Sequence, residues 1–287
     1  MLKKIAVGTA NFTQPYGVLS PEKKALDKKI VQSILYSAQQ AGINTFDTAF
    51  GYGNFLNILP ENFSFKDSRI ITKFNVLDSY DEILSQVKMI YDQYSLVYEG
   101  LLIHDPQNLS CVDEKELCRF FENVKTKGYV KKIGVSVYDL KEFEAFKKIV
   151  KPDLVQIPLN PFNQTFKNSD FIDYIQDNNI EVHARSLFLQ GVLLSDNAPP
   201  LLGQLAPFLE KFNHIAKEYS SKLGALLMCA NAQNFVQKWV LGLASLENLN
   251  TLMDQMKHVQ VLKDESIFDC FSATIHPSVD PRNWCKL

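Results

Sequence analysis

The sequence is poor in cysteine and shows little excess of either charge. Its five cysteines form an odd number without a CxxC pair: Cys111, Cys118, Cys229, Cys270 and Cys285. A disulfide framework or a zinc ribbon is therefore not indicated, and reduced thiols are expected. Thirty Lys plus Arg stand against 32 Asp plus Glu, a formal charge of -2. The basic residues are scattered, so no nucleic-acid partner is expected.

Long apolar runs are also missing. No segment offers the ~18 uninterrupted apolar residues of a membrane span, and residues 1–7 lack the apolar core of a secretory signal. We therefore expect a cytoplasmic protein without a membrane partner. No metal site is predicted, because four of the histidines have no partner at a metal-ligating spacing: His183, His214, His258 and His276.

The chain does contain a regular alternation of strand-like and helix-like segments. Eight short β-rich runs occur at residues 5–8, 45–48, 70–74, 100–104, 133–137, 154–158, 181–187 and 238–243. Several are continuously apolar, as in parallel strands covered on both sides. At 287 residues, the chain suits an α/β fold of the (β/α)8 TIM-barrel type, with residues 1–287 as a single domain. An open doubly wound sheet would show much the same alternation.

The segments between the strands carry helical periodicity and end signals. Ile30, Ile34 and Ala38 are spaced to share one helix face, and Ser79 with Glu82 is a candidate capping box. Residues 189–222 are longer than one crossover needs and contain three prolines, which predicts an irregular loop before a helix.

Polar residues stand near the ends of three successive predicted strands. These are Asp47, Lys73 and His104, with Tyr52 in the loop after Asp47. In an α/β barrel the carboxyl ends of the strands share one rim, where catalytic residues gather. Each residue alone has an ordinary structural explanation, but the combination is chemically specific.

The combination provides the groups that carbonyl reduction requires. A tyrosine, with an ordinary pKa of about 10, is a reluctant proton donor near neutrality. A nearby Lys73 ammonium would lower the pKa of Tyr52, Asp47 would keep that lysine charged, and a neutral His104 could hydrogen-bond the substrate oxygen.

The motifs around these residues resemble those of the aldo-keto reductase family. GINTFDTA at residues 42–49, followed by Tyr52 and Gly53, is similar to that family's Asp and Tyr signature. ITKF at 71–74, LLIHDP at 101–106 and KIGVS at 132–136 resemble its Lys, His and fifth strands, and the likeness covers nearly the whole chain. The resemblance implies Asp47, Tyr52, Lys73 and His104 as a tetrad of catalytic residues.

The same resemblance implies a nicotinamide dinucleotide, with NADP first because the family favours it and NAD possible. Gln156 would meet the nicotinamide amide, and the stretch that resembles the 2′-phosphate site is VLGLASLEN at residues 240–248. The cofactor-binding residues implied are Ser136, Gln156, Arg185, Ser186, Leu187, Gln190, Gly242, Ser245 and Asn248.

Several positions depart from the family pattern. Val137 stands where an amide-binding Asn is usual, and Arg185 stands where an aromatic residue often covers the nicotinamide; its flat guanidinium could stack there instead. Gly242 and Asn248 carry no charge for a 2′-phosphate, and Leu252 stands where an adenine-contacting Asn is expected. Ser245, near a predicted helix N-terminus, could still offer a hydroxyl.

The leading hypothesis is an NAD(P)H-dependent oxidoreductase that reduces the carbonyl of an aldehyde, ketone or sugar-like small molecule, with Tyr52 as proton donor. A catalytically weak barrel that acts as a cofactor-binding or interaction protein is the alternative, favoured by the departures. A barrel isomerase or sugar-binding enzyme without nicotinamide is weaker, since it leaves Tyr52 and Lys73 unexplained. The tail at residues 264–287 is expected to be too short to roof a deep pocket.

Overall fold

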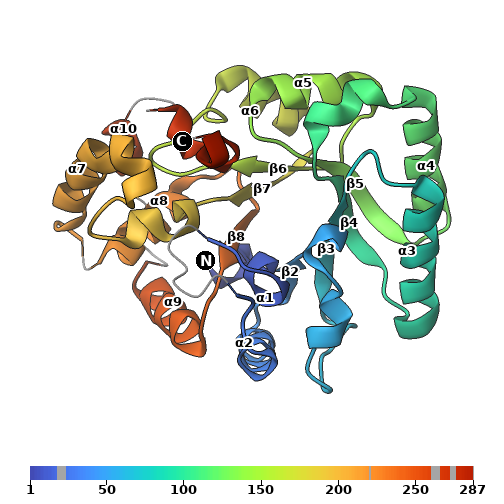
Figure 1. The fold of residues 1–287 in the computed structure, drawn as a ribbon, viewed down its shortest axis with the longest axis horizontal. Coiled ribbons are helices and arrows are strands. Elements are labelled where there is room, and N and C mark those ends of the chain that lie inside the picture. Colours follow the sequence, from blue (N-terminus) through green and yellow to red (C-terminus); the bar gives the residue numbers. More distant parts are fainter. Residues whose placement is uncertain (18–23, 220, 260–265, 272–275, 287) are drawn as a thin grey trace.

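Eight parallel strands close into a barrel in a computed structural model of the chain, which describes residues 1–17, 24–219, 221–259, 266–271 and 276–286. Each strand pairs with the next along the chain, and β8 pairs back with β1. Figure 1 shows the helices arranged around these strands. The predicted TIM barrel is confirmed, and the open doubly wound alternative is wrong.

The strands and helices have the following bounds. The strands are β1 (Ile5–Gly8), β2 (Thr45–Asp47), β3 (Arg69–Phe74), β4 (Tyr98–Ile103), β5 (Val130–Ser136), β6 (Leu154–Pro158), β7 (Glu181–Arg185) and β8 (Lys238–Gly242). The α-helices are α1 (Ala10–Thr13), α2 (Lys28–Gln40), α3 (Tyr80–Tyr94), α4 (Glu114–Thr126), α5 (Leu140–Ile149), α6 (Ser169–Asp177), α7 (Ala206–Ala216), α8 (Lys222–Ala232), α9 (Leu246–Val259) and α10 (Ser266–Asp269). Short 3-10 helices are η1 (Leu2–Lys4), η2 (Phe50–Tyr52), η3 (Phe55–Ile58), η4 (Pro106–Cys111), η5 (Leu189–Leu194), η6 (Pro200–Leu205), η7 (Pro277–Val279) and η8 (Pro281–Lys286).

The strand predictions differ from the structure only at their ends. The strands β3, β4 and β5 begin one to three residues earlier than expected, and residues 48, 104, 137, 186–187 and 243 lie beyond the strands to which they were assigned. The pairing continues past one such end, since the His104 amide donates to the Phe74 carbonyl at 2.8 Å. Terminal residues of this kind are the least determined part of a strand.

The interior of the barrel is filled by a small cluster separate from the outer core. Ile71, Leu102 and Leu154 form this cluster, each 0% exposed. Gly134 on β5 is required beside it, because a Cβ at that position would lie 1.7 Å from the Leu154 carbonyl oxygen. Side chains two residues further along these strands point the same way, into the carboxyl end of the barrel.

The outer core lies between the strands and the helices. On α2 the buried residues are Val31, Ile34, Leu35 and Ala38, whereas Ile30, spaced to share a face with Ile34 and Ala38, is 42% exposed. The cap on α3 is confirmed, with Ser79 Oγ accepting from the Glu82 amide at 3.4 Å. Among the described helices, none is long and apolar enough to cross a membrane.

The long connection after β7 holds more structure than expected. The 3-10 helices η5 and η6 and then a complete helix, α7, precede α8. The expected order of an irregular stretch followed by a helix is present, but the stretch is partly 3-10 helical and a second helix, α8, follows α7. Leu209, Phe212 and Ala216 of α7 are buried, so this added helix packs through an apolar face.

Candidate active site

Three of the four predicted catalytic side chains lie at strand ends on one rim of the barrel. Asp47 is the last residue of β2, Lys73 is the last but one of β3, and His104 follows β4 directly. Because Lys73 lies two residues beyond Ile71, it points into the barrel as Ile71 does. Tyr52 ends η2, the short helix after β2. The fold thus brings together four residues spread over more than fifty positions.

Asp47 and Lys73 form a buried ion pair. Lys73 Nζ lies 2.6 Å from Asp47 Oδ1 and 3.0 Å from the carbonyl oxygen of Thr48, and the side chains of Lys73 and Asp47 are 1% and 5% exposed. Burial lowers the pKa of Lys73, while the carboxylate opposes that change. The pair holds the ammonium 5.6 Å from the centre of the Tyr52 ring.

Tyr52 and His104 contact each other above this ion pair. The Tyr52 hydroxyl is 3.4 Å from His104 Nε2, and the two rings meet edge to face with centroids 5.5 Å apart. Burial, reinforced by Asp47, raises the pKa of Tyr52, although Arg185 opposes this rise. The expectation that this pKa would be lowered was wrong: in the free protein the phenol is held protonated, as a proton donor must be.

His104 is held in its neutral form. Burial lowers the pKa of His104 to about 3, and the neighbouring Lys73 and Arg185 cations add to that effect. A neutral imidazole has one ring nitrogen that donates and one that accepts. His104 can therefore hydrogen-bond the Tyr52 hydroxyl and a substrate oxygen without adding charge to the site.

A series of side-chain hydrogen bonds from β5 and β6 reaches the ion pair from the other side. Ser136 Oγ donates to Gln156 Oε1 at 3.2 Å, and Gln156 Nε2 donates to Asp47 Oδ2 at 2.8 Å. Both oxygens of Asp47 are thus engaged. The Gln156 amide retains one further N–H and one further lone pair with which to meet a ligand.

The loop after β7 covers the rim in an unusual backbone conformation. Ser186, Leu189 and Gln190 have positive φ angles of 64°, 45° and 52°, which non-glycine residues seldom adopt. The Ser186 carbonyl accepts from Asn160 Nδ2 at 2.9 Å, which helps to hold the loop in place. Strained backbone of this kind concentrates at functional sites, because surrounding contacts must maintain it.

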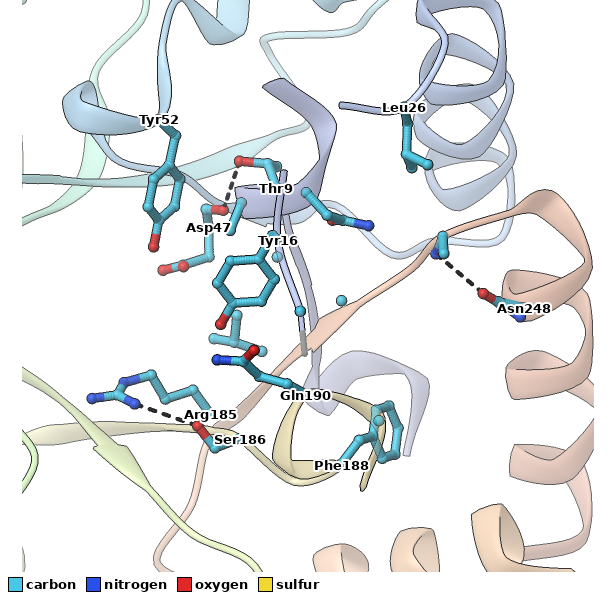
Figure 2. A pocket seen from close by; sticks show the side chains of 18 of the residues that line it. Thr9, Tyr16, Leu26, Asp47, Tyr52, Arg185, Ser186, Phe188, Gln190 and Asn248 are labelled. Atoms are coloured by element: carbon cyan, nitrogen blue, oxygen red, sulfur yellow. Dashed lines mark hydrogen bonds between the residues drawn. The ribbon is translucent and has the colours of Figure 1, made fainter. Parts of the chain in front are cut away.

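A cleft of about 660 Å³ runs from these residues across the rim. Asp47, Tyr52, Gln156 and Arg185 are among its lining residues at one end, and Leu26 and Asn248 are among those at the other. Figure 2 shows Tyr52, Asp47 and Arg185 on one side of the pocket and Leu26 with Asn248 on the opposite side, with Tyr16 and Gln190 between. Such a volume is within the range of small-molecule and cofactor sites.

Comparison with known proteins identifies the family of the chain. The chain matches the sequence model of the aldo/keto reductase family over residues 4–270. The protein belongs to the aldo/keto reductase family. The fold is similar to that of the aldo-keto reductase AKR11C1 from Bacillus halodurans in its holo form, at 16% identity and a TM-score of 0.71, over 96% of this chain and 94% of that one.

A second similar fold is that of the glycerol dehydrogenase AKR11B4 from Gluconobacter oxydans, at 18% identity and a TM-score of 0.66, over 96% of this chain and 94% of that one. At such identities the likeness establishes the fold alone. A search of curated proteins by sequence gave no match.

Two departures from the family pattern lie beside the tetrad. Val137 is buried with no polar group on its side chain, and its carbonyl oxygen accepts from Arg185 Nη2 at 3.0 Å. Arg185 lines the cleft, and its guanidinium lies 4.0 Å from the centre of the Tyr138 ring. One flat face of Arg185 is therefore already covered by an aromatic ring.

Two of the predicted 2′-phosphate residues, Ser245 and Asn248, lie at the N-terminus of α9. Ser245 Oγ accepts from the Asn248 amide and Asn248 Oδ1 accepts from the Ala244 amide, each at 3.1 Å. Gly242 and Asn248 line the cleft, whereas Leu252 is 2% exposed and packs in the core. Ser245 is not among the lining residues, since its hydroxyl caps the helix. Lys24 and Asp27 supply charged groups at the same end.

Sequence reasoning missed several residues around the site. Tyr16, Leu26 and Phe188 line the cleft, and Tyr138 stacks against Arg185. Arg282 reaches the rim from the tail and stacks on Tyr138 as well, although residues 260–265 and 272–275 of that tail lie outside the described part. Loop residues carry no periodicity, so no sequence signal marked these positions.

Within the described ranges, no group of three His, Cys, Asp or Glu side chains is placed to hold a metal ion.

Proposed function

We propose that the protein is an NAD(P)H-dependent reductase of small-molecule aldehydes, ketones or sugar-like carbonyl compounds, with Tyr52 as proton donor. The observation that carries the proposal is the joined set of a buried Lys73–Asp47 pair and a Tyr52 hydroxyl 3.4 Å from His104 Nε2, at the end of a cleft. Family membership supports oxidoreductase chemistry in general.

The cleft fits an elongated dinucleotide. Gln156 stands at the tetrad end with amide capacity to spare, the Ser186 to Gly191 loop borders the middle, and Asn248 lies at the far end. These residues would hold the nicotinamide amide, the central part and the adenosine, respectively. When bound in reduced form, the cofactor supplies a hydride to the carbonyl carbon.

Tyr52 completes the reaction by giving its hydroxyl proton to the oxygen that becomes an alkoxide. The carbonyl carbon would gain the hydride and its two electrons from the reduced cofactor, and the oxygen would gain the proton of Tyr52. Lys73, fixed by Asp47 at 2.6 Å, stabilises the phenolate that remains. His104, neutral because burial lowers its pKa, hydrogen-bonds the reacting oxygen.

The dinucleotide is NADP or NAD. The adenosine end has uncharged Gly242 and Asn248 on the β8 to α9 connection and both Lys24 and Asp27 across the cleft. A 2′-phosphate is favoured by charge-assisted hydrogen bonds. NADP is proposed first on family grounds, and NAD is compatible with this lining.

A titration of the purified protein with NADPH and with NADH, followed by nicotinamide fluorescence, tests cofactor binding. Tyr52→Phe should keep that binding and lose carbonyl reduction by about 10²- to 10⁴-fold, the usual contribution of a positioned acid. Tyr16→Phe is the matched control, because it removes the other labelled phenol of the same cleft in Figure 2. Full activity in Tyr52→Phe would show that the proton donor is misassigned.

The second candidate is a barrel that binds a cofactor or partner without turnover. The observation that favours it is the absence of the amide-binding Asn, since Val137 offers no side-chain hydrogen bond, together with the use of Ser245 and Asn248 as helix caps. Failure of both dinucleotides to bind at about millimolar concentration, or binding without reduction of any aldehyde, would put this candidate first.

A further inference from the structure

Two arginines share the ring of Tyr138. The Arg185 guanidinium lies 4.0 Å from the ring centre and the Arg282 guanidinium 3.9 Å. They take opposite faces, because one face has no room for two guanidiniums at these distances. Arg185 comes from the end of β7 and lines the cleft, whereas Arg282 comes from η8 in the tail.

The two guanidiniums differ in how their charge is compensated. Arg282 is paired with two carboxylates, Asp280 at 2.7 Å and Glu142 at 2.5 Å. Arg185 donates only to neutral oxygens, the Val137 carbonyl at 3.0 Å and Ser186 Oγ at 3.3 Å, and has no ion-pair partner in the part of the chain that the structure describes. A guanidinium carries more N–H donors than these two contacts use.

The surroundings of Arg185 leave the reacting end of the cleft positive. Asp47 and Lys73 form an ion pair at 2.6 Å and carry no net charge together. The charge of Arg185 therefore makes the net charge of this group of three residues positive. His104 adds no charge, because its pKa is lowered to about 3. A half-buried cation without a counter-ion beside a cleft favours an anionic ligand, and guanidinium edges match carboxylates in geometry.

We infer that Arg185 is a specificity-determining residue that binds a carboxylate on the substrate, so that the protein prefers carbonyl compounds that carry an acidic group. The inference rests on the proposed reductase function and narrows its substrate class. Tyr138 packs against one face of the Arg185 guanidinium, which lines the cleft.

The test compares 4-carboxybenzaldehyde with its uncharged methyl ester as substrates. In the wild type the acid should have the lower KM, and Arg185→Gln should reduce the acid-to-ester ratio of kcat/KM by about 10- to 100-fold, the size of a charge-assisted contact. The different reactivity of the two aldehydes cancels when this ratio is compared between proteins. Arg185→Lys should restore part of the preference.

Arg282→Gln is the matched control. This substitution removes a cation from the other face of the same ring, but that cation is already paired with Asp280 and Glu142. The acid-to-ester ratio of kcat/KM should therefore change by less than about threefold. An equal loss in both arginine variants would mean that the stacked cluster acts only through structure, and it would overturn the inference.

Binding without turnover separates this inference from the proposed reaction. Calorimetric titration with 4-(hydroxymethyl)benzoate and with its methyl ester measures recognition even if no aldehyde is reduced. Tighter binding of the benzoate in the wild type, lost in Arg185→Gln, supports the subsite whether or not Tyr52 is the proton donor. Equal binding of acid and ester, or an Arg185→Gln effect confined to NADPH affinity, would assign the arginine to the cofactor and overturn the inference.

Discussion

The two ends of the cleft are built by different means. At the reacting end, Asp47, Lys73 and Gln156 are buried and joined by side-chain hydrogen bonds of 2.6 and 2.8 Å. At the end proposed for the adenosine, Ser245 and Asn248 use their side chains to cap a helix, and Asn248 is exposed. The reacting end is held rigidly by strand ends that face one another, whereas the far end depends on one loop and one helix terminus that can be altered independently.

The largest expected effect follows from breaking the reacting end at Lys73. Lys73→Met leaves the Asp47 carboxylate buried without its cation, which should lower the free energy of unfolding by about 3–5 kcal/mol and reduce turnover by at least ~10²-fold. Denaturant unfolding and steady-state rates measure the two losses.

The double variant Asp47→Asn with Lys73→Met is its control. It removes both charges, so much of the stability should return while the activity does not. A single Lys73→Met variant as stable as the wild type would mean that the pair is less coupled than its 2.6 Å separation indicates.

The next prediction concerns the charge of His104. Because its pKa is lowered to about 3, the imidazole should stay neutral from pH 5 to 8, and its ¹⁵N NMR shifts should be constant over that range. Its folded pKa lies below the ~6.5 of an unfolded histidine, so below pH 6.5 the unfolded state binds more protons and stability falls as the pH falls toward 3.

Removal of the Arg185 cation tests why the pKa of His104 is lowered. Arg185→Gln should raise the pKa of His104, since Arg185 disfavours the protonated ring, although burial remains the larger effect. A His104 titration with its midpoint near pH 6.5 in the wild-type protein would show that this end of the cleft is more open to water than its buried lining indicates.

At the adenosine end a smaller change should alter preference rather than destroy function. Asn248→Arg adds a cation to the cleft lining and should tighten NADPH binding by about tenfold, with NADH changed less than about twofold. Asn250→Arg adds the same charge on an exposed position of α9 that does not line the cleft. An equal gain in NADPH affinity in both variants would indicate a general electrostatic attraction rather than a contact with the 2′-phosphate.

The smallest effect is expected at Ser245. Ser245→Ala removes the acceptor for the Asn248 amide and should cost about 1 kcal/mol in the free energy of unfolding, while dinucleotide affinity changes less than about twofold. Ser245→Asp keeps an acceptor at the cap and should restore the stability. A large loss of NADPH affinity in Ser245→Ala would instead place its hydroxyl in the binding site.

The sequence by itself indicated the alternation of strands and helices and the candidate catalytic residues at the strand ends, and the resemblance to the family favoured a closed barrel over an open sheet. Apolar runs such as residues 101–103 are typical of strands covered on both faces, and Asp47, Lys73 and His104 stand at the ends of such runs, where the period of two directs them into the barrel. Motif resemblance added the order of the tetrad. These features are local, so they can be read along the chain.

Only the tertiary structure decided the charge states and the partners across the rim. The pKa of Tyr52 is raised rather than lowered because burial outweighs nearby cations, and burial is a property of the folded chain. The contacts of Arg185 and Arg282 with the Tyr138 ring join residues from β7 and from the tail, nearly a hundred positions apart. No spacing rule links such residues, because loops bring them together by packing rather than by periodicity.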